Sequence, residues 1–103
     1  MNHFIRERLQ DAELLAQLAE ETAELGKAAL KLRRVLDGKN PTPVSMKEAF
    51  DNFEEEIADV LLCLEVLGYD LKEIGLYKAF MDVKRERWVR RLQEAETWAK
   101  TDT

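Results

Sequence analysis

The side chains in this chain that could do chemistry are mainly carboxylates. The sequence holds 21 Asp and Glu residues but a single histidine, His3, and a single cysteine, Cys63. Catalytic triads that use histidine, and zinc sites built from several Cys or His ligands, are therefore excluded. Two acidic motifs remain as candidates, EETAE at residues 20–24 and EIAD at residues 56–59. In each motif, two acids three residues apart would project from the same side of a helix.

Both acidic pairs are expected at the flank of an apolar stripe rather than at the solvent pole of the helix. At about 100° per residue, Glu21 lies about 60° from Leu18 of its own stripe, and Glu24 lies about 120° from it. Glu56 and Asp59 take about the same two angles on the second helix. When the two stripes pack together, these four carboxylates would converge at one edge of the interface.

A cluster of four carboxylates has to be neutralised, because like charges that are partly removed from water repel one another or take up protons. A bound divalent cation would resolve the repulsion. With oxygen donors only, the hard ion Mg²⁺, or Mn²⁺, fits better than zinc or copper. The alternative interpretation is a solvated acidic face, since Glu-rich helices are commonplace. The pattern alone leaves both interpretations open.

Three helices are expected to position these residues, because the composition favours helix over strand and only four glycines and two prolines interrupt the chain. The expected helices cover roughly residues 4–36, 46–67 and 71–96. Gly38 and the prolines of residues 39–43 would end the first helix. Ser45 and Glu48 have the spacing of a capping box that would start the second. The first helix is also expected to break near residues 10–11.

The first two helices should pack against each other, antiparallel because their connection is short. Each carries its apolar residues on one side at helical spacing. The first stripe comprises Leu14, Leu18, Leu25, Ala29, Leu32 and Leu36. The second comprises Phe50, Phe53, Ile57, Val60, Leu64 and Leu67.

The third helix is apolar on two sides and would need two partners. One stripe comprises Leu71, Ile74, Met81, Trp88 and Leu92, and the other Leu76, Phe80 and Val83. Three helices cannot readily bury all of this surface, so we expect a homo-oligomer, either a dimer or a tetramer, that forms a larger helical bundle. The alternative is that the second stripe consists of scattered surface residues. Within each subunit, residues 1–103 would form a single all-α domain with its core at about 9–96.

The overall charge and hydropathy narrow the range of partners. A formal net charge of −5 argues against a nucleic acid polymer as the main partner. The sequence contains no run of about 18 apolar residues, so no membrane-spanning helix is expected. The first residues lack the apolar stretch of a signal peptide, so a cytoplasmic location is expected.

The ordered set of motifs resembles the EExxE…ExxD signature of MazG-like nucleoside triphosphate pyrophosphohydrolases, in the all-α NTP pyrophosphatase superfamily. The likeness extends to DVKRERW at residues 82–88, which is similar to the family's segment with Asn or Asp, Lys and Arg. It covers roughly residues 9–92, with a gap between the acidic motifs at the long end of the family's range. The resemblance implies hydrolysis of a nucleoside triphosphate between its α and β phosphates. The implied biological role is nucleotide-pool sanitation.

The resemblance also implies roles for individual residues. The Mg²⁺ ligands would be Glu21, Glu24, Glu56 and Asp59. Glu20 or Glu55 would orient or deprotonate the attacking water. Asp82 stands where asparagine is common and would come near the metal. Lys84 and Arg87 would neutralise phosphate oxygens, and Lys31, which flanks the first acidic motif, is a further candidate for phosphate contact.

Two other functions remain open at this point. The chain could be a non-enzymatic helical dimerisation or interaction module with a solvated acidic face. It could also be a degenerate family member that binds nucleotide or metal without turnover.

Overall fold

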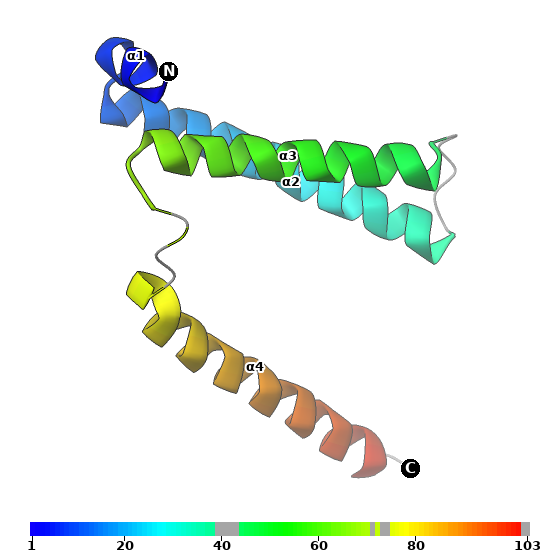
Figure 1. Ribbon diagram of the computed structural model, residues 1–103. Helices are drawn as coiled ribbons and strands as arrows, with labels where there is room; N and C mark the ends of the chain where they lie inside the picture. The colour runs from blue at the N-terminus through cyan, green and yellow to red at the C-terminus, as the bar shows by residue number, and fades with distance from the viewer. Residues whose placement is uncertain (39–43, 71, 73–74, 102–103) are drawn as a thin grey trace. The chain divides into compact units, whose positions relative to one another are not determined.

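The computed structural model describes residues 1–38, 44–70, 72 and 75–101. These residues form four α-helices and no strand, which confirms the all-α prediction. Figure 1 shows the helices in chain order: α1 (Asn2–Arg8), α2 (Asp11–Asp37), α3 (Met46–Val66) and α4 (Gly75–Thr101). The expected break near residues 10–11 separates α1 from α2. The predicted first helix is therefore a short helix followed by a long one.

The helix ends on either side of residues 39–43 follow from their capping residues. Gly38 ends α2 with a φ of 68°, a left-handed conformation that favours glycine. Ser45 begins α3, because its side-chain oxygen accepts a hydrogen bond from the Glu48 backbone N–H at 3.1 Å. Both assignments confirm the sequence prediction. The expected start of the third helix at Leu71 lies outside the described residues.

The last helix is longer than expected. We predicted an end near residue 96, whereas α4 continues to Thr101. Residues 94–100 hold no glycine or proline that would stop a helix, so the helix continues.

The helices α2 and α3 pack side by side and run in opposite directions, as predicted (Figure 1). Their buried side chains are Leu14, Ala28 and Leu32 on α2, and Ala49 and Val66 on α3. Along each helix of this hairpin, buried or half-buried residues recur at alternating spacings of four and three, and we refer to this set as the seam. On α2 the seam comprises Leu14, Leu18, Glu21, Leu25, Ala28 and Leu32. On α3 it comprises Ala49, Phe53, Glu56, Val60, Cys63 and Leu67.

The predicted apolar stripes were wrong at some positions. Ala29 is exposed and Leu36 is 55% exposed, while Ala28 lies in the core. Phe50 is also exposed, and Ala49 beside it is buried. The reason is that helical spacing alone does not choose between adjacent apolar residues: Ala28 and Ala29, or Ala49 and Phe50, both lie near the apolar side of their helix.

The short helix α1 packs against α3. The Asn2 amide Nδ2 donates a hydrogen bond to Glu65 Oε2 at 3.1 Å, and Ile5 is half-buried. The Arg8 guanidinium lies 3.4 Å from the centre of the Phe4 ring. The Arg8–Phe4 contact is internal to α1, whereas the Asn2–Glu65 hydrogen bond and the packing of Ile5 hold α1 at the end of the α2–α3 hairpin where α3 finishes.

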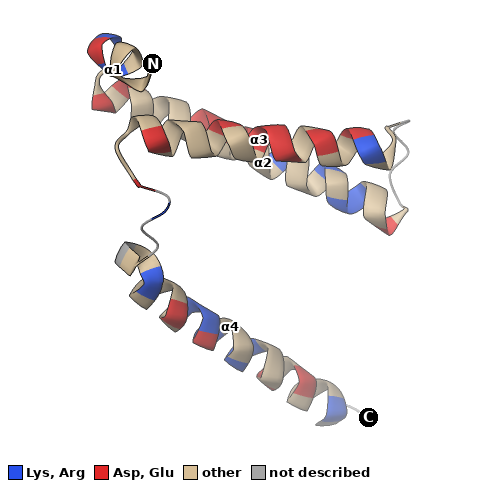
Figure 2. Cartoon of the chain, in the orientation of Figure 1, with Lys and Arg blue, Asp and Glu red and all other residues tan. Residues whose placement is uncertain are grey.

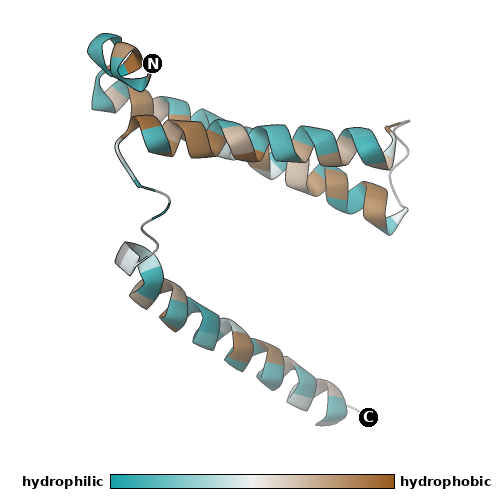
Figure 3. Cartoon of the chain, in the orientation of Figure 1, coloured by the Kyte–Doolittle hydropathy of each residue, from teal (hydrophilic) through white to brown (hydrophobic). Residues whose placement is uncertain are grey.

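The chain divides into two compact units, residues 1–71 and residues 72–103, and the expectation of one domain stays a prediction. The helix α4 belongs to the second unit, and none of its described side chains is buried. Phe80 is 68% exposed and Trp88 is 64% exposed. Figure 3 shows apolar residues interspersed with hydrophilic ones along this helix. The stripe residues Leu71 and Ile74, and the side chain of Leu76, lie outside the described part. Among the helices described, none is long and apolar enough to cross a membrane.

Candidate functional site

Three of the four predicted metal ligands lie together in the α2–α3 hairpin. One carboxylate oxygen from each of Glu21, Glu56 and Asp59 lies within 4.8 Å of the other two. Glu21 comes from α2, and the other two residues come from neighbouring turns of α3. Figure 2 shows how strongly acidic residues are concentrated along α3. We refer to these three residues as the acidic triad.

Two members of the acidic triad occupy seam positions of the hairpin. Glu21 follows Leu18 by three residues and precedes Leu25 by four, and both of these leucines are half-buried. Glu56 has the same relation to Phe53 and to Val60 on α3. Carboxylates therefore stand where this helix pair elsewhere places mostly apolar side chains. Such placement lowers stability unless the charges are compensated.

The electrostatics of the acidic triad reflect this position. Burial raises the pKa of the Glu56 carboxyl above its ordinary value. The charges of Asp59 and Glu21 raise that pKa further, with additional contributions from Glu24 and Glu55. Within the described residues, no Lys, Arg or His nitrogen lies within 4.0 Å of the three triad carboxylates. Their mutual repulsion is thus not offset by an ion pair from this part of the chain.

The donor set of the acidic triad suits a hard divalent cation. All three groups offer carboxylate oxygens, which Mg²⁺ and Mn²⁺ prefer over softer donors. Three oxygens bound to one octahedral Mg²⁺ include neighbouring pairs about 3 Å apart as well as any opposite pair at about 4 Å. The triad oxygens lie within 4.8 Å of one another, so the side chains would have to move closer to share one ion. The donor types suit the metal that the sequence predicted, and its binding stays a prediction.

The fourth predicted ligand, Glu24, is not part of the acidic triad. It is exposed, and its Oε1 lies 3.3 Å from Lys27 Nζ. Its charge nevertheless contributes to the raised pKa of Glu56, so it lies near enough to interact electrostatically with that carboxyl. The role of Glu24 as a ligand stays a prediction.

For the predicted water-activating acids and for Lys31, a predicted phosphate ligand, the structure gives the exposure and the position along the helix. Glu20 and Glu55 are exposed, and Glu55 directly precedes Glu56 on α3. Lys31 is half-buried on α2, about two turns beyond Glu24. Their catalytic and phosphate-binding roles stay predictions.

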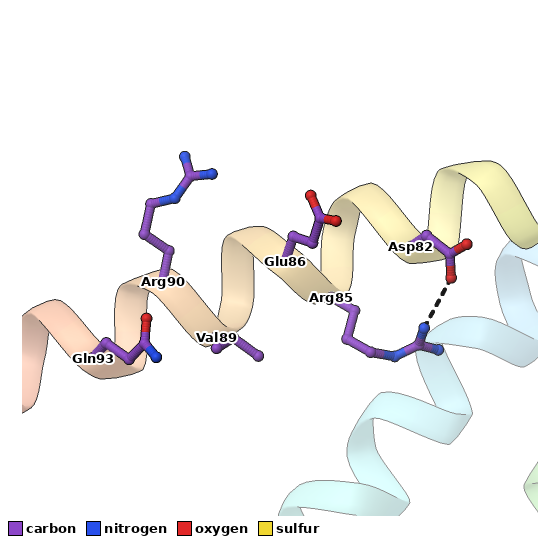
Figure 4. A pocket seen from close by; sticks show the side chains of 6 residues that line it. All are labelled: Asp82, Arg85, Glu86, Val89, Arg90 and Gln93. Carbon is purple, nitrogen blue, oxygen red and sulfur yellow. Dashed lines mark hydrogen bonds and ion pairs between the residues drawn. The ribbon is translucent and has the colours of Figure 1, made fainter.

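The predicted residues of α4 lie in the second unit. Asp82 is half-buried and accepts hydrogen bonds from Lys78 Nζ at 2.8 Å and from Arg85 Nη1 at 3.0 Å. Figure 4 shows the Arg85 contact, with Glu86 and Arg90 farther along the helix. Lys84 and Arg87 are exposed. Both cationic partners of Asp82 come from its own helix, and its place near a metal stays a prediction.

A pocket of about 220 Å³ adjoins the acidic triad, and sequence reasoning missed it. Glu21 and Asp59 form part of its wall, and most of the remaining lining is aliphatic. The full lining comprises Ile5, Leu9, Leu14, Gln17, Glu21, Asp59, Leu62, Cys63 and Val66. Ile5 and Leu9 belong to α1 and its end, whose packing on α3 carried no clear signal in the sequence. We refer to this hollow as the α1 pocket.

The lone cysteine lines the α1 pocket without the features of a nucleophile. Burial raises the pKa of the Cys63 thiol, and the charges of Glu21 and Asp59 raise it further. A raised pKa keeps the group protonated at neutral pH, whereas nucleophilic attack requires the thiolate. Cys63 therefore acts as a small seam residue.

Comparison with known proteins finds no matching family model, no similar curated protein and no similar solved structure. Function has to be inferred from the residues themselves and from their geometry.

Proposed function

We propose that the chain is an Mg²⁺-dependent nucleoside triphosphate pyrophosphohydrolase that releases a nucleoside monophosphate and pyrophosphate. The observation that carries the proposal is the acidic triad, in which oxygens from two helices lie within 4.8 Å of one another at half-buried and exposed positions. The sequence resemblance to MazG-like enzymes supplies the reaction. The hairpin supplies a site whose donors suit the metal that such a reaction uses.

In this proposal Glu21, Glu56 and Asp59 hold Mg²⁺, and Glu24 is the fourth ligand. When bound, the cation neutralises phosphate charge and lowers the pKa of a coordinated water. Glu20 or Glu55 orients the attacking water and accepts its proton. The role of Asp82, as a ligand or a support of one, comes from the sequence resemblance alone.

The phosphate chain is bound by Lys31, Lys84 and Arg87 in the proposal. Residues 1–71 carry fifteen acidic and eight basic side chains, whereas residues 72–103 carry six acidic and eight basic ones. The basic residues of the chain's second part would thus attract a triphosphate that the first part would otherwise repel. Figure 2 shows these Lys and Arg residues spaced along α4.

We further propose that the enzyme is a cytoplasmic homo-oligomer, a dimer or a tetramer, that works in nucleotide-pool sanitation. The exposed apolar residues of α4 support the oligomer, because a 27-residue helix with no described buried side chain lacks a core of its own.

A second candidate function is a helical interaction module without enzymatic activity. The same exposed residues of α4, among them Phe80, Trp88 and Trp98, favour it, because large exposed apolar residues mark protein interaction sites. In this case the triad would be a solvated acidic patch. A degenerate family member that binds nucleotide or metal without turnover is the intermediate case.

The experiment that separates these candidates is an assay of the full chain with a panel of NTPs and dNTPs plus Mg²⁺. The proposal predicts a monophosphate and pyrophosphate in equal amounts. A diphosphate with orthophosphate would contradict the assigned bond. Metal-dependent thermal stabilisation without turnover would indicate the degenerate member, and the absence of both would favour the interaction module.

A further inference from the structure

Gln17 connects the acidic triad to the α1 pocket. It lies one turn before Glu21 on α2, and its Nε2 donates a hydrogen bond to Glu21 Oε1 at 2.8 Å. The same side chain is part of the lining of the α1 pocket. An ionised carboxylate only accepts hydrogen bonds, so the nitrogen end of the Gln17 amide has to face Glu21.

Glu65 also accepts a hydrogen bond from an amide, that of Asn2 at 3.1 Å, whereas several other carboxylates of the chain have a cationic partner. Lys47 Nζ donates to Asp51 Oδ2 at 2.6 Å, and Arg33 Nε lies 3.7 Å from Asp37 Oδ2. A cationic partner cancels the charge of a carboxylate and would repel a metal ion at the same oxygen atoms. An amide partner holds the carboxylate while leaving its full negative charge for a cation.

We propose that Gln17 is a positioning residue for Glu21, which it holds in the orientation that binds the cation. The inference rests on the proposed function, because it requires a cation at the acidic triad. A carboxylate offers about four lone-pair sites on its two oxygens, so one hydrogen bond from Gln17 leaves Glu21 able to act as a ligand. Hydrogen-bond partners of this kind fix the orientation of a metal-binding side chain, so that side chain loses less conformational entropy when the metal binds.

The test is Mn²⁺ binding by the full chain, followed through the electron paramagnetic resonance signal of the free ion. Gln17→Met keeps the length and helix propensity of the side chain but removes the donor. We expect it to raise the Kd for Mn²⁺ about tenfold, the lower end of the range for partners of metal ligands. The metal-free melting temperature should stay unchanged, because Gln17 is exposed.

Two further variants make the test specific. Gln17→Lys retains a donor but adds a positive charge, and we expect it to weaken Mn²⁺ binding at least as much as Gln17→Met. The matched control is Gln93→Met, the same substitution at an exposed position of α4, which should bind Mn²⁺ as the wild type does.

The outcomes distinguish this inference from the proposed function. Wild-type affinity in both Gln17 variants would overturn the inference alone. A lower metal-free melting temperature with unchanged Mn²⁺ affinity would also overturn it, since the role would then be purely structural. If the wild type itself bound no Mn²⁺, the proposed function would fall together with the inference.

Discussion

At the scale of single residues, the site is defined by carboxylates placed where apolar side chains would stabilise the fold better. Glu21 and Glu56 lie in the seam between α2 and α3, and the pKa of Glu56 is raised first by burial and then by its acidic neighbours. A position that costs stability in the free protein is typical of a functional site. Replacing the charge should therefore stabilise the metal-free protein.

Glu56→Gln tests this expectation through the pH dependence of stability. The pKa of Glu56 is higher in the folded state than in the unfolded state. The carboxyl therefore contributes favourably to the stability of the folded protein, and this contribution is fully present below the unfolded pKa of about 4.3. That contribution is lost as the pH rises through the raised folded pKa. At neutral pH without metal, we expect Glu56→Gln to melt at a higher temperature than the wild type. The difference should vanish in acid.

Adding Mg²⁺ to the same two proteins should reverse the order of their melting temperatures, because the wild type alone keeps the full donor set. Glu54→Gln is the matched control, since Glu54 is exposed on the same helix. A variant that is stabilised by Mg²⁺ as strongly as the wild type would contradict a role for Glu56 as a ligand.

Asp59→Asn tests the contribution of the acidic triad to turnover. Asn keeps the shape of the side chain but removes the charge that binds the cation. We expect kcat/KM for the best nucleotide to fall at least about 100-fold, with an unchanged helical circular dichroism spectrum. Glu24→Gln tests the fourth ligand: a comparable loss would place Glu24 on the cation, whereas near-normal turnover would leave three ligands.

At the scale of helices, local signals defined the elements well. Gly38 ends α2 and Ser45 begins α3, as their capping roles predicted. The break near residues 10–11 was also expected. The seam was less predictable, because Ala28 and Ala29 are adjacent apolar residues and helical spacing alone does not decide which of them is buried. The alternating spacing of four and three around Glu21 was the signal that could have identified it as a seam residue.

The α1 pocket illustrates what the sequence could not reveal. It forms because α1 packs on α3 through Ile5 and the Asn2–Glu65 hydrogen bond, contacts between residues about 60 positions apart. A period or a cap is local in the chain, whereas such a contact depends on tertiary packing. Gln17 is a different case, because its hydrogen bond to Glu21 joins residues four apart on one helix, and that spacing was the signal that could have identified it.

Ser45→Ala tests the capping of α3, the helix that carries two residues of the triad. Losing the hydrogen bond to the Glu48 N–H should cost about 1 kcal/mol of stability. For a chain of this size, that corresponds to a melting temperature lower by roughly 4–8 °C. Turnover at 25 °C should stay at the wild-type level, because the folded site is unaltered. A turnover loss at that temperature would show that the cap also positions the triad.

At the scale of the whole molecule, composition differs between the two units. The first is strongly acidic and contains the hairpin, whereas the second has more basic than acidic residues and a helix with no described buried side chain. Figure 3 shows that apolar residues occur along α4 as well as along the hairpin. The sequence predicted a helix that is apolar on two sides and needs two partners, and the proposed homo-oligomer would supply one of them.

Light scattering coupled to gel filtration tests the proposed assembly. We expect a mass of at least twice the 12.0 kDa of one chain. Trp88→Glu should shift the protein toward the monomer, because it places a charge in an apolar contact. Glu94→Gln, at another exposed position of α4, should leave the mass unchanged. A wild-type mass of one chain would refute the oligomer without bearing on the triad.

The central claim is that two helices of one hairpin hold a shared cation between their carboxylates. The most direct measurement is the location of Mn²⁺ in crystals of the full chain by its anomalous scattering. We predict a single strong peak, or a close pair of peaks, within bonding distance of Glu21, Glu56 and Asp59. Crystals grown with Mn²⁺ that show no peak there, with the three side chains directed into solvent, would contradict it.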